Sequence, residues 1–126
     1  MIKFKSLFKS FKYAFRGLVK TFREEQNLQI QSSIALIIIL LAWFFQVNYI
    51  EWCLLVLAIS LVILTEIINS AVERATDILK PRINGYVKEI KDIAAAAVMV
   101  ASLAALAVGL IIFGPYFANF LNVVYN

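Results

Sequence analysis

Residues 93–113 of this 126-residue chain have the sequence IAAAAVMVASLAALAVGLIIF. The run contains no charged side chain, and Ser102 is its single polar residue. A helix needs about 20 consecutive apolar residues to cross a hydrocarbon core of ~30 Å. We therefore expect a membrane-spanning helix here, over residues 88–114.

Two further apolar stretches precede this one. Residues 34–45 have no polar side chain and predict a span over residues 28–47, and Trp52–Leu64 is almost entirely apolar and predicts a helix over residues 52–79. Hydrophobic residues make up 63% of the chain, whereas soluble domains contain about 45–50%. A soluble domain this small could not bury so much apolar surface. The sequence thus predicts one all-α, integral membrane domain with three transmembrane helices.

The positive charges predict how the chain is oriented in the membrane. Seven of the twelve Lys and Arg residues precede the first span, and five lie within residues 74–91 between the second and third spans. None lies within residues 46–51 or after residue 113. Because cytoplasmic loops carry the excess of Lys and Arg, we expect a multi-pass protein with the N-terminus in the cytoplasm and the C-terminus outside.

Residues 1–27 predict an amphipathic helix at the membrane surface. Phe and Leu recur at spacings of three and four residues along one face, and Lys and Arg follow the other face. Such a helix lies in the membrane interface with its cations near anionic headgroups. An interfacial anchor without a catalytic part fits this segment equally well. We expect no nucleic-acid binding, because the aromatic residues are separated from the basic ones.

The chain has no histidine and a single cysteine, Cys53. This composition excludes an intrachain disulfide, a histidine-based zinc site and catalysis by a histidine-activated nucleophile. The four glycines form neither a Walker A loop nor a G-x-G-x-x-G motif. Any chemistry must use carboxylates, amides, lysines, arginines, hydroxyls and bound ions.

An acidic residue, Glu66, interrupts the second predicted span. It lies fourteen residues after Trp52, ~21 Å along a helix that rises 1.5 Å per residue. An acid at that depth in the hydrocarbon core costs a few kcal/mol of insertion free energy, so such residues are usually functional.

Asn69, Glu73 and Asp77 follow on the same helix face as Glu66. At 100° per residue the four side chains form one stripe, less than a quarter turn wide. Clustered acids repel one another unless a cation or proton intervenes, and oxygen ligands suit Mg²⁺, which commonly accompanies phosphate. The alternative is that Glu73 and Asp77 are solvated residues paired with neighbouring basic residues, Arg74 or Lys80.

Lys91 and Asp92 directly precede the third apolar run. They are suited to contacts with a nucleotide, or alternatively they cap the helix and extend to the interface. The run itself is rich in Ala and Gly, which let helices approach closely in lipid. Because three helices are too few to enclose the polar stripe fully, we expect a homo-oligomer with a site between subunits.

Three motifs resemble one known family, the small prokaryotic diacylglycerol kinases and undecaprenol kinases. Residues 66–77, EIINSAVERATD, fit the pattern E-x-x-N-[ST]-A-[IV]-E-x-x-x-D. Residues 91–98, KDIAAAAV, resemble the family's K-D-x-[AG]-x-[AG]-A-V, and residues 10–18, SFKYAFRGL, are followed by Glu25-Gln-Asn27. The resemblance covers nearly the whole chain.

The resemblance implies a homotrimer in the bacterial plasma (inner) membrane, with active sites between subunits. Its activity would be ATP- and Mg²⁺-dependent phosphorylation of the hydroxyl of a membrane lipid alcohol, either diacylglycerol or undecaprenol. It implies that Glu66 is the general base, that Asn69 orients the site, and that Glu25 and Glu73 hold Mg²⁺. The implied nucleotide contacts are Tyr13, Glu25, Glu73, Asp77, Lys91 and Asp92.

Three positions depart from the family pattern: Ser6, Gln31 and Asn84, which bear on nucleotide binding. Residues 25–27 resemble the undecaprenol-type branch slightly more, but the acceptor stays open. The alternative function is a small ion- or proton-coupled transporter subunit with an intramembrane glutamate. The bias of the acids toward the cytoplasmic end, beside a basic loop, favours the kinase. A purely structural or regulatory membrane protein would leave the stripe unexplained.

Overall fold

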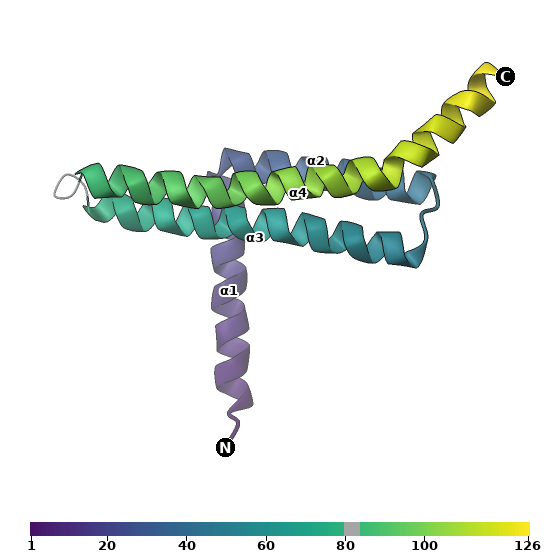
Figure 1. Ribbon diagram of the computed structural model, residues 1–126. Helices are drawn as coiled ribbons and strands as arrows, with labels where there is room; N and C mark the ends of the chain where they lie inside the picture. Colours follow the sequence, from purple (N-terminus) through teal and green to yellow (C-terminus); the bar gives the residue numbers. More distant parts are fainter. Residues whose placement is uncertain (80–83) are drawn as a thin grey trace.

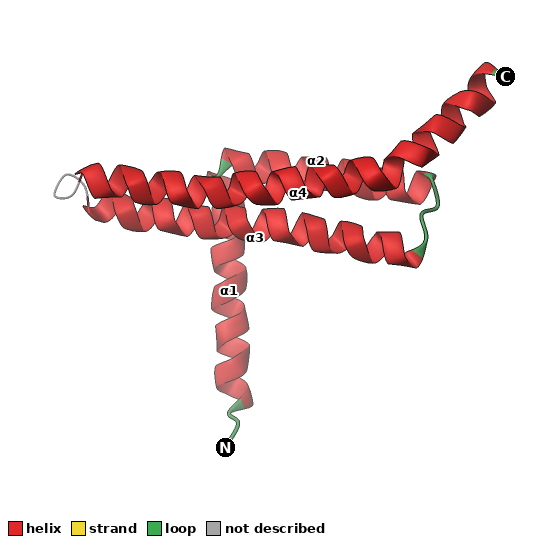
Figure 2. Ribbon diagram, in the orientation of Figure 1, coloured by secondary structure: helices red, strands yellow, loops and turns green. Residues whose placement is uncertain are grey.

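The structure is a computed structural model that describes residues 1–79 and 84–126, except for the Asn84 side chain. Within these ranges the chain forms four α-helices and no strand: α1 (Phe4–Glu24), α2 (Gln26–Phe44), α3 (Tyr49–Leu79) and α4 (Asn84–Tyr125) (Figures 1 and 2). The all-α prediction is thus confirmed. Lys80, considered above as an ion-pair partner, and the departing side chain of Asn84 lie outside the described residues.

Helices α2, α3 and α4 are each long and apolar enough to cross a membrane. This agrees with the three predicted spans, although α2 ends three residues before the expected 28–47 and α3 begins three residues before the expected 52–79. Helices α3 and α4 lie side by side along most of their length, with α2 packed beside them (Figure 1). Many large apolar side chains on their outer faces are exposed, as expected of surfaces that contact lipid.

Helix α4 contains the third predicted span, residues 88–114, and extends beyond it at both ends. α4 is 42 residues long and contains Pro115 in its interior. Proline removes one backbone hydrogen bond and crowds the preceding turn, so it ends or bends a helix. Here α4 bends and continues, and its last part turns away from the bundle (Figure 1). We call residues 116–125 the tail.

Helix α1 runs crosswise to the other three helices (Figure 1). The backbone of Glu25 is extended, with φ −105° and ψ 109°, so it separates α1 from α2. The predicted helix over residues 1–27 therefore ends at Glu24. We call Glu24 and Glu25 the elbow.

The turn between α2 and α3 is fixed by its own polar contacts. Gln46 adopts a φ of 52°, a left-handed conformation that few residues other than glycine take up. The Glu51 N–H donates to Asn48 Oδ1 at 2.9 Å, and the Asn48 N–H donates to Glu51 Oε1 at 3.2 Å. This reciprocal pair is a capping box that begins α3.

The buried apolar core lies at this same end of the bundle. Its members come from α2, α3, α4 and the turn: Ala42, Val47, Leu55, Ile112 and Phe113. The Phe45 ring packs against those of Phe113 and Tyr116, and the Tyr116 hydroxyl donates to Glu51 Oε1. We call this the aromatic end. The opposite part of the bundle, where α2 begins and α3 ends, is the acidic end.

Candidate active site

Glu66 lies near the middle of α3, and its side chain is almost fully enclosed. The residue is 3% exposed. Its partner comes from α2, where Gln31 Nε2 donates to Glu66 Oε2 at 3.3 Å. A single chain buries Glu66 and Asn69, whereas Glu73 is half-buried and Asp77 is exposed. Three helices therefore enclose only part of the stripe, and the homo-oligomer stays a prediction.

Several polar atoms around Glu66 are buried without a hydrogen-bond partner among the described residues. They are Gln31 Oε1, Asn69 Oδ1 and Ser70 Oγ. The amide of Asn69 uses its nitrogen instead, since Nδ2 donates to Glu73 Oε1 at 3.4 Å. An unsatisfied buried polar atom costs about 1–3 kcal/mol. Such a concentration therefore suits a site that a bound molecule completes.

The elbow brings a second pair of acids to the acidic end. The carboxylates of Glu25 and Glu73 are close enough to interact with that of Glu66, and Asn27 also lies beside Glu66. Arg74 Nη2 lies 2.9 Å from Glu24 Oε2 and 3.3 Å from Glu25 Oε1. Arg74 thus ties α3 to the elbow, and it pairs with neither Glu73 nor Asp77.

One predicted nucleotide contact is paired with the stripe. Lys91 on α4 forms an ion pair with Asp77 on α3. The adjacent residue Asp92 is exposed, because consecutive residues on a helix point about 100° apart. The structure therefore brings Lys91, but not Asp92, to the end of the stripe.

Tyr13 lies apart from the other candidate residues in a single chain. It is exposed on α1, eleven residues before the end of that helix, which is ~17 Å along the helix axis. The structure does not bring Tyr13 to the stripe.

The acidic end offers oxygen donors of the kind that bind Mg²⁺. Among residues 1–79 and 84–126, no three His, Cys, Asp or Glu side chains converge into a preformed metal cage. Mg²⁺ typically binds through one or two carboxylates, with water and substrate phosphate oxygens filling its octahedron. Glu73, Glu25 and the unpartnered Asn69 Oδ1 are oxygen donors of this kind, so the residues fit Mg²⁺ held together with a phosphate.

An apolar cavity of about 470 Å³ runs between α2, α3 and α4. Gln31 contributes to its lining at the acidic end and Phe117 at the aromatic end. Between them the walls are almost entirely aliphatic, with Ser102 as a further polar side chain. A hydrocarbon chain is the ligand that such a surface accommodates without loss of hydrogen bonds.

The sequence is similar to those of known proteins. A family model described as prokaryotic diacylglycerol kinase matches residues 12–113. The chain belongs to the prokaryotic diacylglycerol kinase family. As a member of this family it is an enzyme, a lipid kinase, and the transporter alternative is not supported. The match includes every candidate site residue and ends before the tail.

The curated relatives of this chain are named either undecaprenol kinase or diacylglycerol kinase. An undecaprenol kinase of Bacillus subtilis (strain 168) is 33% identical over 108 residues, which are 86% of this chain and 88% of that protein. A diacylglycerol kinase of Helicobacter pylori (strain ATCC 700392 / 26695) is 35% identical over 97 residues, 77% of this chain and 76% of that protein. A Synechocystis diacylglycerol kinase is 31% identical over 105 residues, 82% of this chain and 60% of that protein.

Sequence reasoning missed two side chains of this kinase's acidic end. Gln31 appeared only as a departure from the family pattern, yet it donates to the Glu66 carboxylate. Ser70 was read only as a motif position, yet it is 2% exposed and its hydroxyl has no partner among the described residues. Little in the sequence distinguishes Gln31, because Gln29, Ser32 and Ser33 lie beside it at the start of the same helix.

Proposed function

We propose that this kinase transfers the γ-phosphoryl group of ATP to the hydroxyl of a membrane lipid alcohol, with Mg²⁺, at the acidic end of the bundle. The observation that carries the proposal is the buried carboxylate of Glu66. It is held by Gln31 and surrounded by unpartnered polar atoms.

The proposal also places the cytoplasmic membrane surface at the height of α1. A basic helix with an apolar face rests at the interface, so α1 marks the cytoplasmic surface of the bacterial plasma membrane. The Arg74 ion pairs tie the elbow of α1 to α3 just over two turns, ~12 Å, beyond Glu66. Asp77 lies eleven residues past Glu66, ~16 Å farther along α3. Glu66 then lies inside the membrane, below the surface marked by α1, where it meets the lipid hydroxyl, while Asp77 meets ATP in water.

Glu66 acts as the general base. Its carboxylate accepts the proton of the lipid hydroxyl as that oxygen bonds to the γ-phosphorus. The bond from the γ-phosphorus to the β,γ-bridging oxygen breaks, and ADP leaves. A positioned base of this kind contributes about 10²–10⁴-fold in rate. Gln31 fixes the carboxylate from α2, and Asn69 orients the site between Glu66 and Glu73.

Glu73 and Glu25 would hold Mg²⁺ against the ATP phosphates. The ion supplies neutralisation of phosphate charge, which is a main part of phosphoryl-transfer catalysis. The carboxylate of Glu25 forms an ion pair with Arg74, so Glu73 is the principal protein ligand of Mg²⁺ in this proposal. Lys91 and Asp77 bind the nucleotide beyond the membrane surface.

Tyr13 is assigned to nucleotide binding by the family resemblance alone, and Asp92 by the resemblance and by its place beside Lys91 before the third apolar run. In a single chain both are exposed and Tyr13 is distant from the stripe. We propose that the protein is a homotrimer in which a neighbouring subunit supplies such contacts. This distance supports a shared site, whereas burial of Glu66 does not require one.

The acceptor belongs to the class of long-chain membrane alcohols, diacylglycerol or undecaprenol. The aliphatic cavity that begins at Gln31 supports either chain type. The relatives' names include both kinases, and the undecaprenol kinase aligns over the larger share of this chain.

A transfer assay tests the proposal and identifies the acceptor. Purified protein in mixed micelles is given γ-labelled ATP and Mg²⁺ with either diacylglycerol or undecaprenol. We expect label in at least one lipid and none after chelation of Mg²⁺. Folded protein that labels neither lipid would contradict the proposal.

A further inference from the structure

The tail is not needed to cross the membrane. The uncharged run from Ile93 to Phe113 already spans ~30 Å as a helix. The tail then adds ten helical residues, ~15 Å of helix. Because the headgroup layer is only about 5–8 Å thick on each side, a straight extension would carry the tail through it into water.

The side chains of the tail do not suit water. The tail contains no charged residue, and its polar side chains other than tyrosine hydroxyls are amides, Asn119 and Asn122. Leu121, Val124 and Tyr125 are all exposed, Tyr125 at 82%. A stretch of exposed apolar side chains at the end of a membrane span is covered by lipid or by protein.

The tail is amphipathic, with one face of asparagines and one apolar face. At 100° per residue, Asn119, Asn122 and the terminal Asn126 fall within about 60° of one another. The opposite half of the helix is apolar and holds the aromatic and aliphatic residues Tyr116, Phe117, Phe120, Leu121, Val124 and Tyr125.

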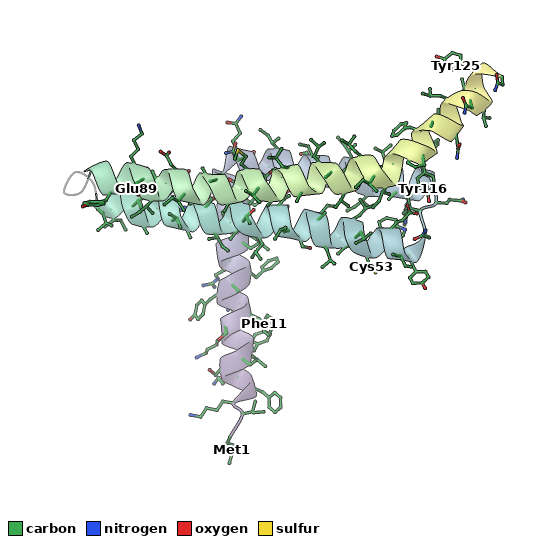
Figure 3. All side chains as sticks on the ribbon, viewed as in Figure 1. Met1, Phe11, Cys53, Glu89, Tyr116 and Tyr125 are labelled. Atoms are coloured by element: carbon green, nitrogen blue, oxygen red, sulfur yellow. The ribbon has the colours of Figure 1, made fainter. Side chains whose placement is uncertain are left out.

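The start of the tail is fixed to the bundle, which sets its direction. Tyr116, directly after Pro115, donates its hydroxyl to Glu51 of α3. Phe45, which directly follows α2, packs its ring against Phe117 and Phe120. Beyond this contact the tail leaves the bundle, from Tyr116 at its base to Tyr125 at its end (Figure 3).

We infer that the tail is an interfacial helix that lies on the membrane surface opposite the acidic end, with its asparagines toward water and Leu121 and Val124 in the headgroup–acyl boundary. Its occupant is the lipid surface, because the tail continues directly from a membrane span and bends at Pro115 where that span ends. Since the tail has no charged side chain, its attachment depends on apolar burial and not on anionic headgroups. The family match ends at residue 113, before the tail begins.

Spin-label accessibility tests this inference in the full-length protein. Cys53 is replaced by Ala, and single cysteines are introduced by Leu121→Cys, Val124→Cys, Asn119→Cys and Asn122→Cys. Each labelled protein is placed in phosphatidylcholine nanodiscs, and collision rates with oxygen and with a water-soluble nickel chelate are measured. Retained kinase activity shows that each labelled variant is folded, since the tail is not part of the site.

We expect oxygen to collide several-fold more often with labels at 121 and 124, and the nickel chelate with labels at 119 and 122, with no change in 1 M salt. Equal nickel accessibility at all four positions would place the tail in water and overturn the inference. Labels at 121 and 124 shielded from both reagents would overturn it as well, because they would show that protein, such as a second copy, covers the apolar face.

Discussion

The two ends of the helical bundle differ in whether their polar side chains are hydrogen-bonded. At the aromatic end, Glu51 accepts from Tyr116 and from the Asn48 backbone, and its own N–H donates to Asn48. At the acidic end, buried oxygens of Gln31, Asn69 and Ser70 have no partner among the described residues. One end is closed by its own contacts, and the other is completed only when something binds.

This difference implies that the two ends contribute to different properties of the protein. The apolar core and the ring contacts lie at the aromatic end, where they hold α2, α3 and α4 together. The unpartnered atoms at the acidic end cost stability, about 1–3 kcal/mol each. Substitutions at the acidic end should therefore reduce activity, and substitutions at the aromatic end should reduce stability.

Among residues other than the general base Glu66, Glu73→Gln is expected to cause the largest loss of catalytic efficiency. Loss of the carboxylate removes the principal ligand proposed for Mg²⁺. We expect kcat/KM to fall on the order of 10–100-fold, with more Mg²⁺ needed for half-maximal rate. A Mg²⁺ titration of the transfer assay measures this, with Glu24→Gln as the matched carboxylate outside the stripe. An unchanged Mg²⁺ requirement in Glu73→Gln would remove Glu73 from the proposed metal site.

A smaller effect is expected for Gln31→Leu. The substitution keeps the apolar packing of α2 but removes the donor to Glu66. A hydrogen bond to a charged group is worth about 1.5–3 kcal/mol, so kcat should fall about tenfold or more while KM for ATP changes little. Gln26→Leu, the same change at an exposed position of α2, is the control. Equal activity of the two variants would mean that Gln31 does not position Glu66.

The membrane spans and the polar stripe were predictable because both depend on local sequence. An uninterrupted apolar run predicts a span, and a fixed turn angle puts Glu66 and Glu73 on one face. Contacts between helices were not predictable, since the Gln31–Glu66 and Arg74–Glu25 pairs depend on how α2 and the elbow are positioned against α3. The full length of α4 was not predictable from its apolar run, because the run indicates where a helix crosses the membrane and not where the helix ends; α4 bends at Pro115 and continues to Tyr125.

At the aromatic end, Phe45→Leu should change stability and leave the chemistry intact. The variant keeps an apolar side chain but loses ring contacts with residues of α4. Each such contact is worth about 0.5–1.5 kcal/mol. We expect the free energy of unfolding in detergent to fall by about 1 kcal/mol or more, with unchanged activity per folded molecule. Phe11→Leu, on exposed α1 (Figure 3), should have almost no effect. A large activity loss in folded Phe45→Leu would break the division between the two ends.

The smallest effect is expected for Asp77→Asn. Its ion pair with Lys91 is largely exposed, 59% for the Asp77 side chain, and exposed pairs contribute about 0–1 kcal/mol. The unfolding free energy should change by less than about 1 kcal/mol, and KM for ATP should rise more than kcat falls. A loss of kcat as large as that of Glu73→Gln would place Asp77 in the reacting centre instead.

The central claim is that the buried carboxylate of the acidic end performs the chemistry. Two matched variants on α3 test it most directly: Glu66→Gln and Glu51→Gln, compared for steady-state transfer to the preferred lipid and for ATP binding. We predict that Glu66→Gln loses about 10²–10⁴-fold in kcat while it still binds ATP, and that Glu51→Gln keeps its kcat. Comparable activity in folded Glu66→Gln and Glu51→Gln would contradict the account.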